Sequence, residues 1–574
     1  MTCAVLVVTA LSCPGTARAA DAPEPRIRTE QQATKLFLGN PSVVRWLERY
    51  PRGAAVARAE FKKQLNRWDV SVHYGEAGQI AGGKVDPSGF VIEALVGPEV
   101  AWPLARGIRL GESINRPLVW LSFCAVFFLC LANLRRPLSV RNLDVLAILS
   151  FSIYLWLFND GRVFASTIAA SVTLTYLMVR CAWIGFTGRI SPGGTFLPVW
   201  VLAGILVFAV GFRIGLNHER SFVLDVGYAG VIGADRLANG ETPYGNFPRR
   251  DTGKPCAEPD PEGDIGDWIQ ENGRCETANA LGDTYGPVNY HAYLPGLWLF
   301  GWSGKWDALP AVHFTTLLFD VLAILGLAAI GFRFGRTPLA LTLALAWAVN
   351  PLTQYPSMSN TNDAIMPALL VWGFWAASSD VGRGTFVALA GWTKLAALVV
   401  VPLWLTYPRA AWRKSLVFSL AFVAATLVSF WALFLGGDPL HEFRVFYERS
   451  FQIQADRSSP FSLWDWGDYH AEGLPDLKWL QRVLQLLLVV AAMTVAVVPR
   501  RKTPLQLAAL TGALLVAFEL LLTHWAALYV AWFYPFVALA TVTGTALCRS
   551  PASVRERGIS RETEAPRDAV PRAV

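Results

Sequence analysis

Charged residues are scarce in this chain. Asp, Glu, Lys and Arg make up 16% of its 574 residues, whereas they make up about 25% of a soluble globular protein. Hydrophobic residues make up 53%, and there are 23 tryptophans, a residue that collects with Tyr at membrane–water interfaces. This composition excludes a soluble globular protein and predicts an all-α polytopic membrane bundle.

The chain also lacks the glycine motifs of nucleotide-binding proteins. It contains neither a P-loop nor a Rossmann fingerprint. Lys and Arg, which give a net charge of +7, cluster in short segments between apolar runs, as in cytoplasmic loops rather than on a nucleic-acid surface. The carboxylates at 258–276 do not resemble a metal-binding loop. We therefore expect no nucleic-acid partner, no cofactor and no metal site, and a divalent cation is left open.

The N-terminal part divides in two. Residues 1–20 resemble a secretory signal peptide, with an apolar stretch before the small-residue sequence ARA-A. They lack its positive n-region, so an uncleaved anchor is the alternative. Residues 21–116 are polar and predict a small α+β unit. QQATKLFLGNPSVVRWLERY has helical periodicity, and two strand-like runs flank a VDPSG turn.

Apolar runs near the ~20 residues that cross a bilayer follow. Additional N-terminal membrane helices are expected within 117–194 and the main membrane domain within 195–548. The predicted spans are 117–133, 143–158, 163–182, 195–215, 311–331, 338–352, 363–378, 385–406, 415–435, 479–498, 504–523 and 526–547. A further apolar piece at 293–302 is too short to span and predicts an interfacial or re-entrant helix anchored by Trp298 and Trp302.

Basic segments set the predicted orientation, because loops rich in Lys and Arg stay in the cytoplasm. They lie at 135–141, 180–189, 333–336, 409–414 and 500–502, and in the Arg-rich tail 549–574. The chain is thus predicted to be a multi-pass plasma-membrane protein with a cytoplasmic C-terminus. The unit 21–116 and the loops 216–310 and 437–478 are then outside.

Two local questions depend on this orientation. Cys256 and Cys275 share the first outside loop, so a disulfide is predicted, and two unpaired thiols are the alternative. Between 363 and 407, two full spans would place 360–363 inside. A helical hairpin at 385–406, bent near 391–394, would place them outside, and we favour the hairpin.

The chemistry is expected in the first outside loop. Asp225 follows the end of a predicted span by about ten residues, and the stretch after it has helical spacing that ends at Gly240. A carboxylate just outside the bilayer can deprotonate a hydroxyl that attacks a lipid-linked donor. The alternative role is an N-cap, since Asp is favoured there. The two roles are compatible.

The order of features resembles the polyprenol-phosphate-sugar-dependent glycosyltransferases of the GT-C superfold, particularly actinobacterial mannosyltransferase-like members. The loop carboxylate at Asp225, the following helix, the Pro-Tyr turn in NGETPYG and the Tyr/Pro-rich element TYGPVNYHAYLPG carry the likeness, which covers about 195–547. In that family the key loop follows the first helix. Here three additional spans, 117–133, 143–158 and 163–182, precede the span that leads into the loop. They depart from the pattern and suggest an N-terminal addition.

The resemblance implies a membrane glycosyltransferase. It would move a sugar, mannose or arabinose, with inversion from a polyprenyl-phosphate donor to a hydroxyl of a glycan or glycolipid acceptor outside the cytoplasm, at the surface of the lipid bilayer. Asp225 is the implied base, with Glu219 as the substitute carboxylate. The alternative is a transporter, a flippase or a non-catalytic binder of lipid-linked sugars, although transporters usually show internal repeats and mid-membrane charges.

A leaving lipid phosphate needs positive charge or hydrogen-bond donors. The outside candidates are Arg220, His291, Arg457, His524 and Trp525. Arg457 could instead be a solvated loop cation.

Lys394 resembles a lysine that often follows a Gly-rich helix in the family. It should face a polar cavity unless it snorkels to the interface.

Further polar and aromatic residues complete the substrate-binding candidates. Asn360, Asn362 and Asp363 lie at a predicted helix start, where they cap the helix or bind sugar hydroxyls. The tyrosines are Tyr228, Tyr244, Tyr285 and Tyr290. Tyr285 and Tyr290 are suited to stacking on sugar rings, and interfacial anchoring is the alternative.

Overall fold

The computed structural model describes residues 27, 29–106, 112–190, 197–247, 282–303, 309–435, 437–471 and 475–548. The predicted signal peptide, the predicted disulfide between Cys256 and Cys275, the carboxylates at 258–276 and the C-terminal tail lie outside these residues. The chain forms two compact units, Met1–Ala101 and Trp102–Val574. The predicted class is confirmed, since the first unit is α+β and the second is an all-helical membrane bundle.

The first unit is built on a four-stranded antiparallel sheet of order β1-β2-β3-β4. Its strands are β1 (Val56–Lys62), β2 (Arg67–Tyr74), β3 (Gly78–Val85) and β4 (Val91–Val96). The VDPSG turn joins β3 to β4, as predicted. The carboxylate of Asp86 accepts hydrogen bonds there from the N–H groups of Gly89 and Phe90, at 2.9 and 2.8 Å.

Two helices complete this unit, α1 (Glu30–Leu38) and α2 (Pro41–Leu47), where the periodicity suggested one continuous stretch. The break arises because Asn40 caps α2, its side chain accepting from the N–H of Ser42 at 3.0 Å, and because Pro41, which lacks a backbone N–H, is best accommodated in the first turn of a new helix. A short helix, α3 (Pro98–Ala101), ends the unit. The division into units falls after Ala101, whereas the sequence placed the boundary at 116. Ile114, in the second unit, is fully buried.

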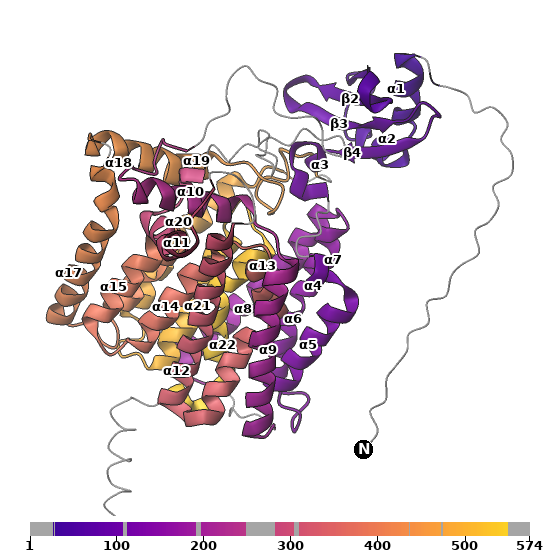
Figure 1. The fold of residues 1–574 in the computed structure, drawn as a ribbon. Coiled ribbons are helices and arrows are strands. Elements are labelled where there is room, and N and C mark those ends of the chain that lie inside the picture. Colours follow the sequence, from indigo (N-terminus) through magenta and orange to yellow (C-terminus); the bar gives the residue numbers. More distant parts are fainter. Residues whose placement is uncertain are drawn as a thin grey trace, which may run out of the picture. The chain divides into compact units, whose positions relative to one another are not determined.

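The second unit is helical throughout the described residues, and Figure 1 shows α10, α18 and α19 gathered at one end of a bundle of longer helices. Its helices are α4 (Glu112–Asn115), α5 (Pro117–Leu131), α6 (Val140–Leu149), α7 (Phe151–Asn159), α8 (Val163–Thr187), α9 (Val199–Arg220), α10 (Asp225–Ala238), α11 (Pro287–Phe300), α12 (Pro310–Ala348), α13 (Pro351–Met358), α14 (Ile365–Trp375), α15 (Asp380–Gly391), α16 (Val401–Leu405), α17 (Trp412–Ser429), α18 (Pro439–Tyr447), α19 (Ile453–Asp456), α20 (Lys478–Val497), α21 (Pro504–Leu520) and α22 (Val530–Val542).

Six helical stretches among the described residues are long and apolar enough to cross a membrane. They are Val140–Asn159, Val163–Thr187, Val199–Arg220, Pro310–Ala348, Trp412–Phe434 and Lys478–Val497. Shorter apolar helices accompany them at Pro117–Leu131, Leu395–Leu405, Pro504–Leu520 and Ala527–Val542. The chain is therefore a multi-pass membrane protein. The piece predicted at 293–302 is part of the longer helix α11.

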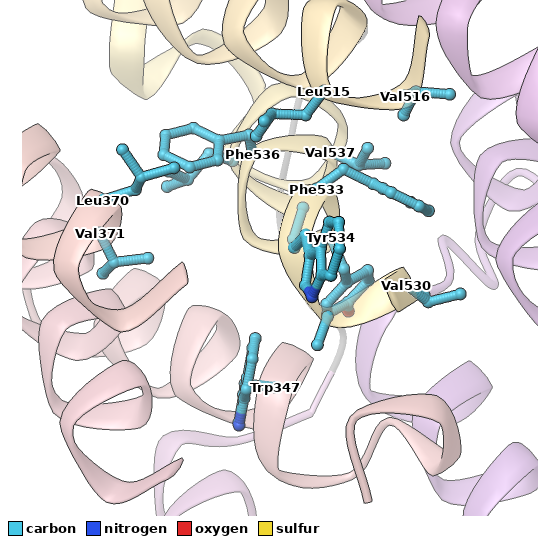
Figure 2. Close-up of a cluster of buried hydrophobic side chains, with 14 of the residues drawn as sticks. Trp347, Leu370, Val371, Leu515, Val516, Val530, Phe533, Tyr534, Phe536 and Val537 are labelled. Carbon is cyan, nitrogen blue, oxygen red and sulfur yellow. The ribbon is translucent and has the colours of Figure 1, made fainter. Parts of the chain in front are cut away.

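The core of the bundle surrounds α22, in which every residue is buried. Figure 2 shows Phe533, Phe536 and Val537 of α22 among side chains of its neighbours. The labelled neighbours are Trp347 of α12, Leu370 and Val371 of α14, and Leu515 and Val516 of α21. A helix that is hydrophobic all round is suited to such burial. Close packing rather than water exclusion holds helices together in lipid.

Two breaks in the long helices agree with the predicted spans. In α12, Arg336 has φ 60° and divides the helix in two. A Cβ on Gly331 would lie 2.5 Å from the Cα of Ala340, so glycine permits the two halves to pack closely. After α15, the chain turns at 392–394 and returns through a 3₁₀ turn, Leu395–Val400, and α16. Arg383 in α15 donates to the Trp404 carbonyl in α16 at 3.1 Å, as the favoured hairpin requires.

A buried ion pair joins α9 to α12. The guanidinium of Arg213 donates to both carboxylate oxygens of Asp320 and, at 3.0 Å, to the Thr353 carbonyl of α13. The indole of Trp347 donates to the same carboxylate at 2.7 Å. Because an unpaired charge inside the membrane is costly, this cluster sets the register between α9, α12 and α13.

We expect Asp320→Ala to lower the free energy of unfolding by about 3–5 kcal/mol, because it leaves the Arg213 charge buried without a partner. Replacing both residues, as Arg213→Met with Asp320→Leu, should restore most of that loss. Unfolding of the purified protein in detergent measures both effects, with Arg220→Ala on the exposed end of α9 as the control. Equal stability of Asp320→Ala and wild type would contradict a register set by this pair.

Candidate functional site

A cavity of about 1060 Å³ lies where the predicted outside loops meet the bundle. Its lining comes from segments far apart in the chain, from α7, the start of α10, the turn before α11, the break after α15, the loop 437–471 and the turn before α22. The charged and titratable side chains among its lining residues, apart from tyrosines, are Asp225, Asp363, Lys394, His441, Glu448, Arg449, Arg457 and His524. Such a concave site with a few polar groups on apolar walls is typical of a small-molecule site.

Backbone pairing brings Asp225 to this cavity. The segment 221–224 runs extended between α9 and α10, and it pairs with the end of α13. The N–H of Phe222 donates to the Met358 carbonyl at 3.1 Å, and the N–H of Leu224 donates to the Ser359 carbonyl at 3.0 Å. Helix α10 begins directly after this pairing, so the position of Asp225 follows from that of α13.

Asn360 holds the same junction with its side chain. Its amide donates to the Ser221 hydroxyl and to the Phe222 carbonyl, both at 2.9 Å, and it accepts from the amide of Asn217 at 2.8 Å. Asn360 has φ 46°, in the left-handed region that asparagine tolerates better than most residues. This buried residue therefore positions Asp225, rather than capping a helix or lining the cavity.

Asp225 is the first residue of α10, and Leu224 is the N-cap. The carboxylate accepts from the N–H of Val226 at 2.9 Å, where the helix dipole favours negative charge. Burial raises the pKa of the Asp225 carboxyl, and the charge of Asp363 raises it further. The Val226 hydrogen bond and the charge of Arg457 oppose this increase. A carboxylate with a raised pKa is a stronger base, as deprotonation of a hydroxyl requires.

Lys394 lies at the break of the hairpin and forms an ion pair with Asp363. The two side chains are 9% and 2% exposed, and the Asp363 carboxylate also accepts from the Trp532 indole at 2.8 Å. The Lys394 ammonium lies 4.6 Å from the centroid of the Trp532 ring and 5.6 Å from those of Tyr285 and Tyr529. Lys394 therefore faces the cavity within an aromatic cage and does not snorkel.

The loop 437–471 contributes one cation, Arg449, that the sequence did not single out. After α18, a π-helical turn, Glu448–Gln452, leads into α19. The Nε of Arg449 lies 3.4 Å from an Oδ of Asp283, and the same carboxylate oxygen accepts from the N–H of Gly245 at 2.8 Å. Arg449 thus links the two outside loops. No pattern distinguishes it in the sequence, because its acidic partner lies in the other loop.

Arg457 and His524 both line the cavity and were both candidates for binding the phosphate, but they differ in charge. The guanidinium of Arg457 stacks on the Trp102 ring, 5.6 Å from its centroid, and is not a solvated loop cation. Burial lowers the pKa of His524, and the charge of Arg457 lowers it further. The His524 imidazole, hydrogen-bonded to the Ser459 hydroxyl at 2.9 Å, is therefore neutral. Of the two roles considered for the phosphate candidates, His524 therefore suits that of a hydrogen-bond donor rather than that of a positive charge.

The structure places the other predicted residues outside the lining. Glu219 is exposed at the end of α9, 3.0 Å from His218, and Arg220 beside it is exposed as well. His291 accepts from the Trp431 indole at 2.8 Å. Neither the substitute carboxylate nor these two phosphate-binding candidates reach the cavity, because α9 and α11 turn those side chains away from it.

Three of the predicted tyrosines do not line the cavity, and their side chains contact other residues instead. Tyr244 donates to the Tyr285 carbonyl at 3.0 Å, and Tyr290 donates to the Gly282 carbonyl at 2.9 Å. Buried Tyr228 packs edge-on against Trp302. Of the predicted tyrosines, Tyr285 is the one that lines the cavity.

Asn362 and Trp525 have partners of their own. Asn362 is buried and donates to the Asn289 side chain at 2.9 Å. The Trp525 indole lines the cavity and donates to the Glu519 carboxylate at 2.9 Å. None of Asn360, Asn362 and Asp363 provides a side-chain cap for α14. Among the described residues, no three His, Cys, Asp or Glu side chains are grouped as metal ligands.

No family model matches the chain, and no curated protein matches it. Among solved structures, the chain is similar to ArnT from Cupriavidus metallidurans bound to undecaprenyl phosphate, with 16% sequence identity and a TM-score of 0.36. The similarity covers 64% of this chain and 63% of that chain. The chain thus spans less than two thirds of the length of that protein.

The close packing of α10 against Asn360 can be tested by substituting Gly227. A Cβ on Gly227 would lie 2.2 Å from the Asn360 carbonyl oxygen, whereas one on Gly211 of α9 would meet nothing within 4 Å. We expect Gly227→Ala to lower the free energy of unfolding by about 1–3 kcal/mol, because α10 must shift. Gly211→Ala should cause no loss, since alanine favours a helix. Unfolding in detergent compares the two, and equal stabilities would show that α10 is not packed as described.

Proposed function

We propose that this protein is an integral-membrane glycosyltransferase. It moves a sugar, mannose or arabinose, from a polyprenyl-phosphate donor to a hydroxyl of a glycan or glycolipid, with inversion and outside the cytoplasm. The supporting observation is that a base with a raised pKa and three cations meet in one cavity. This cavity lies where the predicted outside loops meet the bundle. The sequence resemblance to the GT-C superfold supports the reaction class and the lipid-linked donor.

The reaction follows from these groups. The acceptor hydroxyl oxygen forms a bond to the anomeric carbon of the sugar while the bond from that carbon to the phosphate oxygen breaks. Asp225 takes the hydroxyl proton, and the lipid phosphate leaves with the electron pair. Attack opposite the leaving group inverts the anomeric centre.

Three cations are available to the leaving phosphate, Lys394, Arg449 and Arg457. Each has a carboxylate in its surroundings: Asp363 for Lys394, Asp283 for Arg449 and Asp225 for Arg457. The cavity is therefore close to electrically balanced without ligand. The negative charge that grows on the leaving oxygen meets preorganised donors without requiring them to move.

The base is tested by Asp225→Asn, which removes the proton acceptor at constant shape. We expect sugar transfer from polyprenyl-phosphate mannose or arabinose to membrane glycolipids to fall by about 10²–10⁴-fold, with donor affinity kept. Asp235→Asn, the same change at the other end of α10, is the matched control and should transfer like wild type.

The other outcomes are equally informative. Equal transfer by wild type and Asp225→Asn would show that Asp225 is not the base, while still showing that the protein is a glycosyltransferase. Donor binding without transfer by either protein would favour a transporter, a flippase or a non-catalytic binder.

The pH dependence tests the role of Arg457. Transfer requires deprotonated Asp225, so the rate should rise with pH through the pKa of that carboxyl. Because the charge of Arg457 lowers this pKa, Arg457→Gln should raise it and move the acidic limb of the kcat/KM profile to higher pH. Arg457→Lys keeps the charge and should leave the limb in place. A limb that stays unchanged in Arg457→Gln would argue against Asp225 as the group that titrates.

A further inference from the structure

The cavity has two chemically different parts. One part carries Asp225, Asp363, Lys394 and Arg449. The other is a wall of aromatic rings, here called the aromatic wall, made of Trp102, Tyr154, Phe158, Phe461, His524 and Trp525.

Five rings of the aromatic wall form a continuous series of contacts in space, from Trp525 through Tyr154, Phe158 and Phe461 to His524. The centroid of Tyr154 lies 4.7 Å from that of Trp525 and 5.5 Å from that of Phe158. Phe158 lies 5.6 Å from Phe461, and Phe461 lies 5.0 Å from His524. These separations are those of favourable aromatic pairs, so the wall is preorganised before any ligand arrives.

Half of the aromatic wall comes from the segment that departs from the resembled family. Trp102 and the helix α7 precede the region of resemblance, and α7 directs four residues into the lining, Tyr154, Leu155, Phe158 and Asn159. Their spacing puts them on one helical face. Trp156, on the same helix, is 65% exposed and does not line the cavity. The N-terminal spans are therefore part of the site.

Arg457 connects the aromatic wall to the base. It stacks on Trp102, whose indole is held by donation to the Tyr469 hydroxyl at 2.8 Å. Its charge also acts on Asp225. A ligand lying against the aromatic wall is thus next to the carboxylate that takes the proton.

We propose that the aromatic wall binds a saccharide ring of the acceptor, and that Trp102 and α7 determine which acceptor is used. A sugar ring has an apolar C–H face that gains from burial on aromatic rings and hydroxyls that need hydrogen-bond partners at the edge. Asn159, Ser458 and the neutral His524 lie in the same lining and offer such partners. The isoprenoid chain of a donor is a hydrocarbon and cannot form hydrogen bonds with these polar groups. The assignment of the saccharide as acceptor rests on the proposed function.

Saccharide binding can be measured without turnover. The purified full chain in detergent is titrated with methyl α-D-mannopyranoside, methyl α-D-arabinofuranoside and their disaccharides, with saturation-transfer NMR as the readout. Trp102→Ala should weaken saccharide binding about tenfold, as loss of one stacked ring would. Because Arg457 stacks on Trp102, the binding of polyprenyl phosphate is compared in Phe158→Leu, where it should stay unchanged. Trp102→Phe should restore most of the affinity. Trp156→Ala is the matched control on α7, and Phe158→Leu provides a second variant of the wall.

Transfer assays then separate the two proposals. In an active enzyme, Phe158→Leu should raise the KM for the acceptor and keep both kcat and the KM for the donor. If the wild type binds saccharide through the aromatic wall but transfers no sugar, the glycosyltransferase proposal is contradicted and the saccharide site is supported. Loss of polyprenyl-phosphate binding in Phe158→Leu, or unchanged saccharide binding in both wall variants, would overturn the saccharide site and leave the glycosyltransferase proposal standing.

Discussion

The pairing of Arg213 with Asp320 is the interaction on which the site depends. A guanidinium and a carboxylate buried in a membrane bundle must meet, and here they meet between α9, α12 and α13. One turn further along α9, Asn217 bonds to the end of α13 and to Asn360. Asn360 in turn holds the segment that leads into α10. The register set by this buried pair is thereby transmitted through hydrogen bonds to the first residue of α10, Asp225.

Charge balance is the second constraint on the cavity. Desolvated cations are costly unless a carboxylate is near, and Lys394 and Arg449 each have one in contact. The pairing crosses segment boundaries, since Asp363 and Lys394 come from opposite ends of the α14–α15 pair. The same contacts that make the charges tolerable therefore hold the lining together. An anionic ligand would enter a site whose donors are already oriented, which is the condition for stabilising charge as it develops.

The N-terminal membrane helices are integrated into the bundle. Gly185 of α8 lies against Leu510 of α21 with no room for a Cβ, and the side chain of Gln506 donates to the Gly185 carbonyl at 3.0 Å. Small residues permit such close approach between membrane helices. Because α8 is packed in this way, the neighbouring α7 can present a face to the cavity. A segment that departs from the resembled family in sequence thus shares in building the site.

The sequence by itself determined the membrane class and favoured the hairpin bent near 391–394 and the turn at Asp86. It also named Asp225, Tyr285, Asp363, Lys394, Arg457, His524 and Trp525 as site candidates, and the structure brings these residues into one cavity. Hydropathy, turn chemistry and helix breaks depend on neighbours within a few residues, so they can be read locally. Only the tertiary structure decided that Arg449 and Trp102 join them, that Glu219 and Arg220 face away, and that Asn360 positions rather than binds. Those outcomes depend on partners far along the chain, as with Arg213 and Asp320, which are 107 residues apart. No local pattern encodes such a contact, because either residue alone would suit a solvated loop or a lipid-facing helix end equally well.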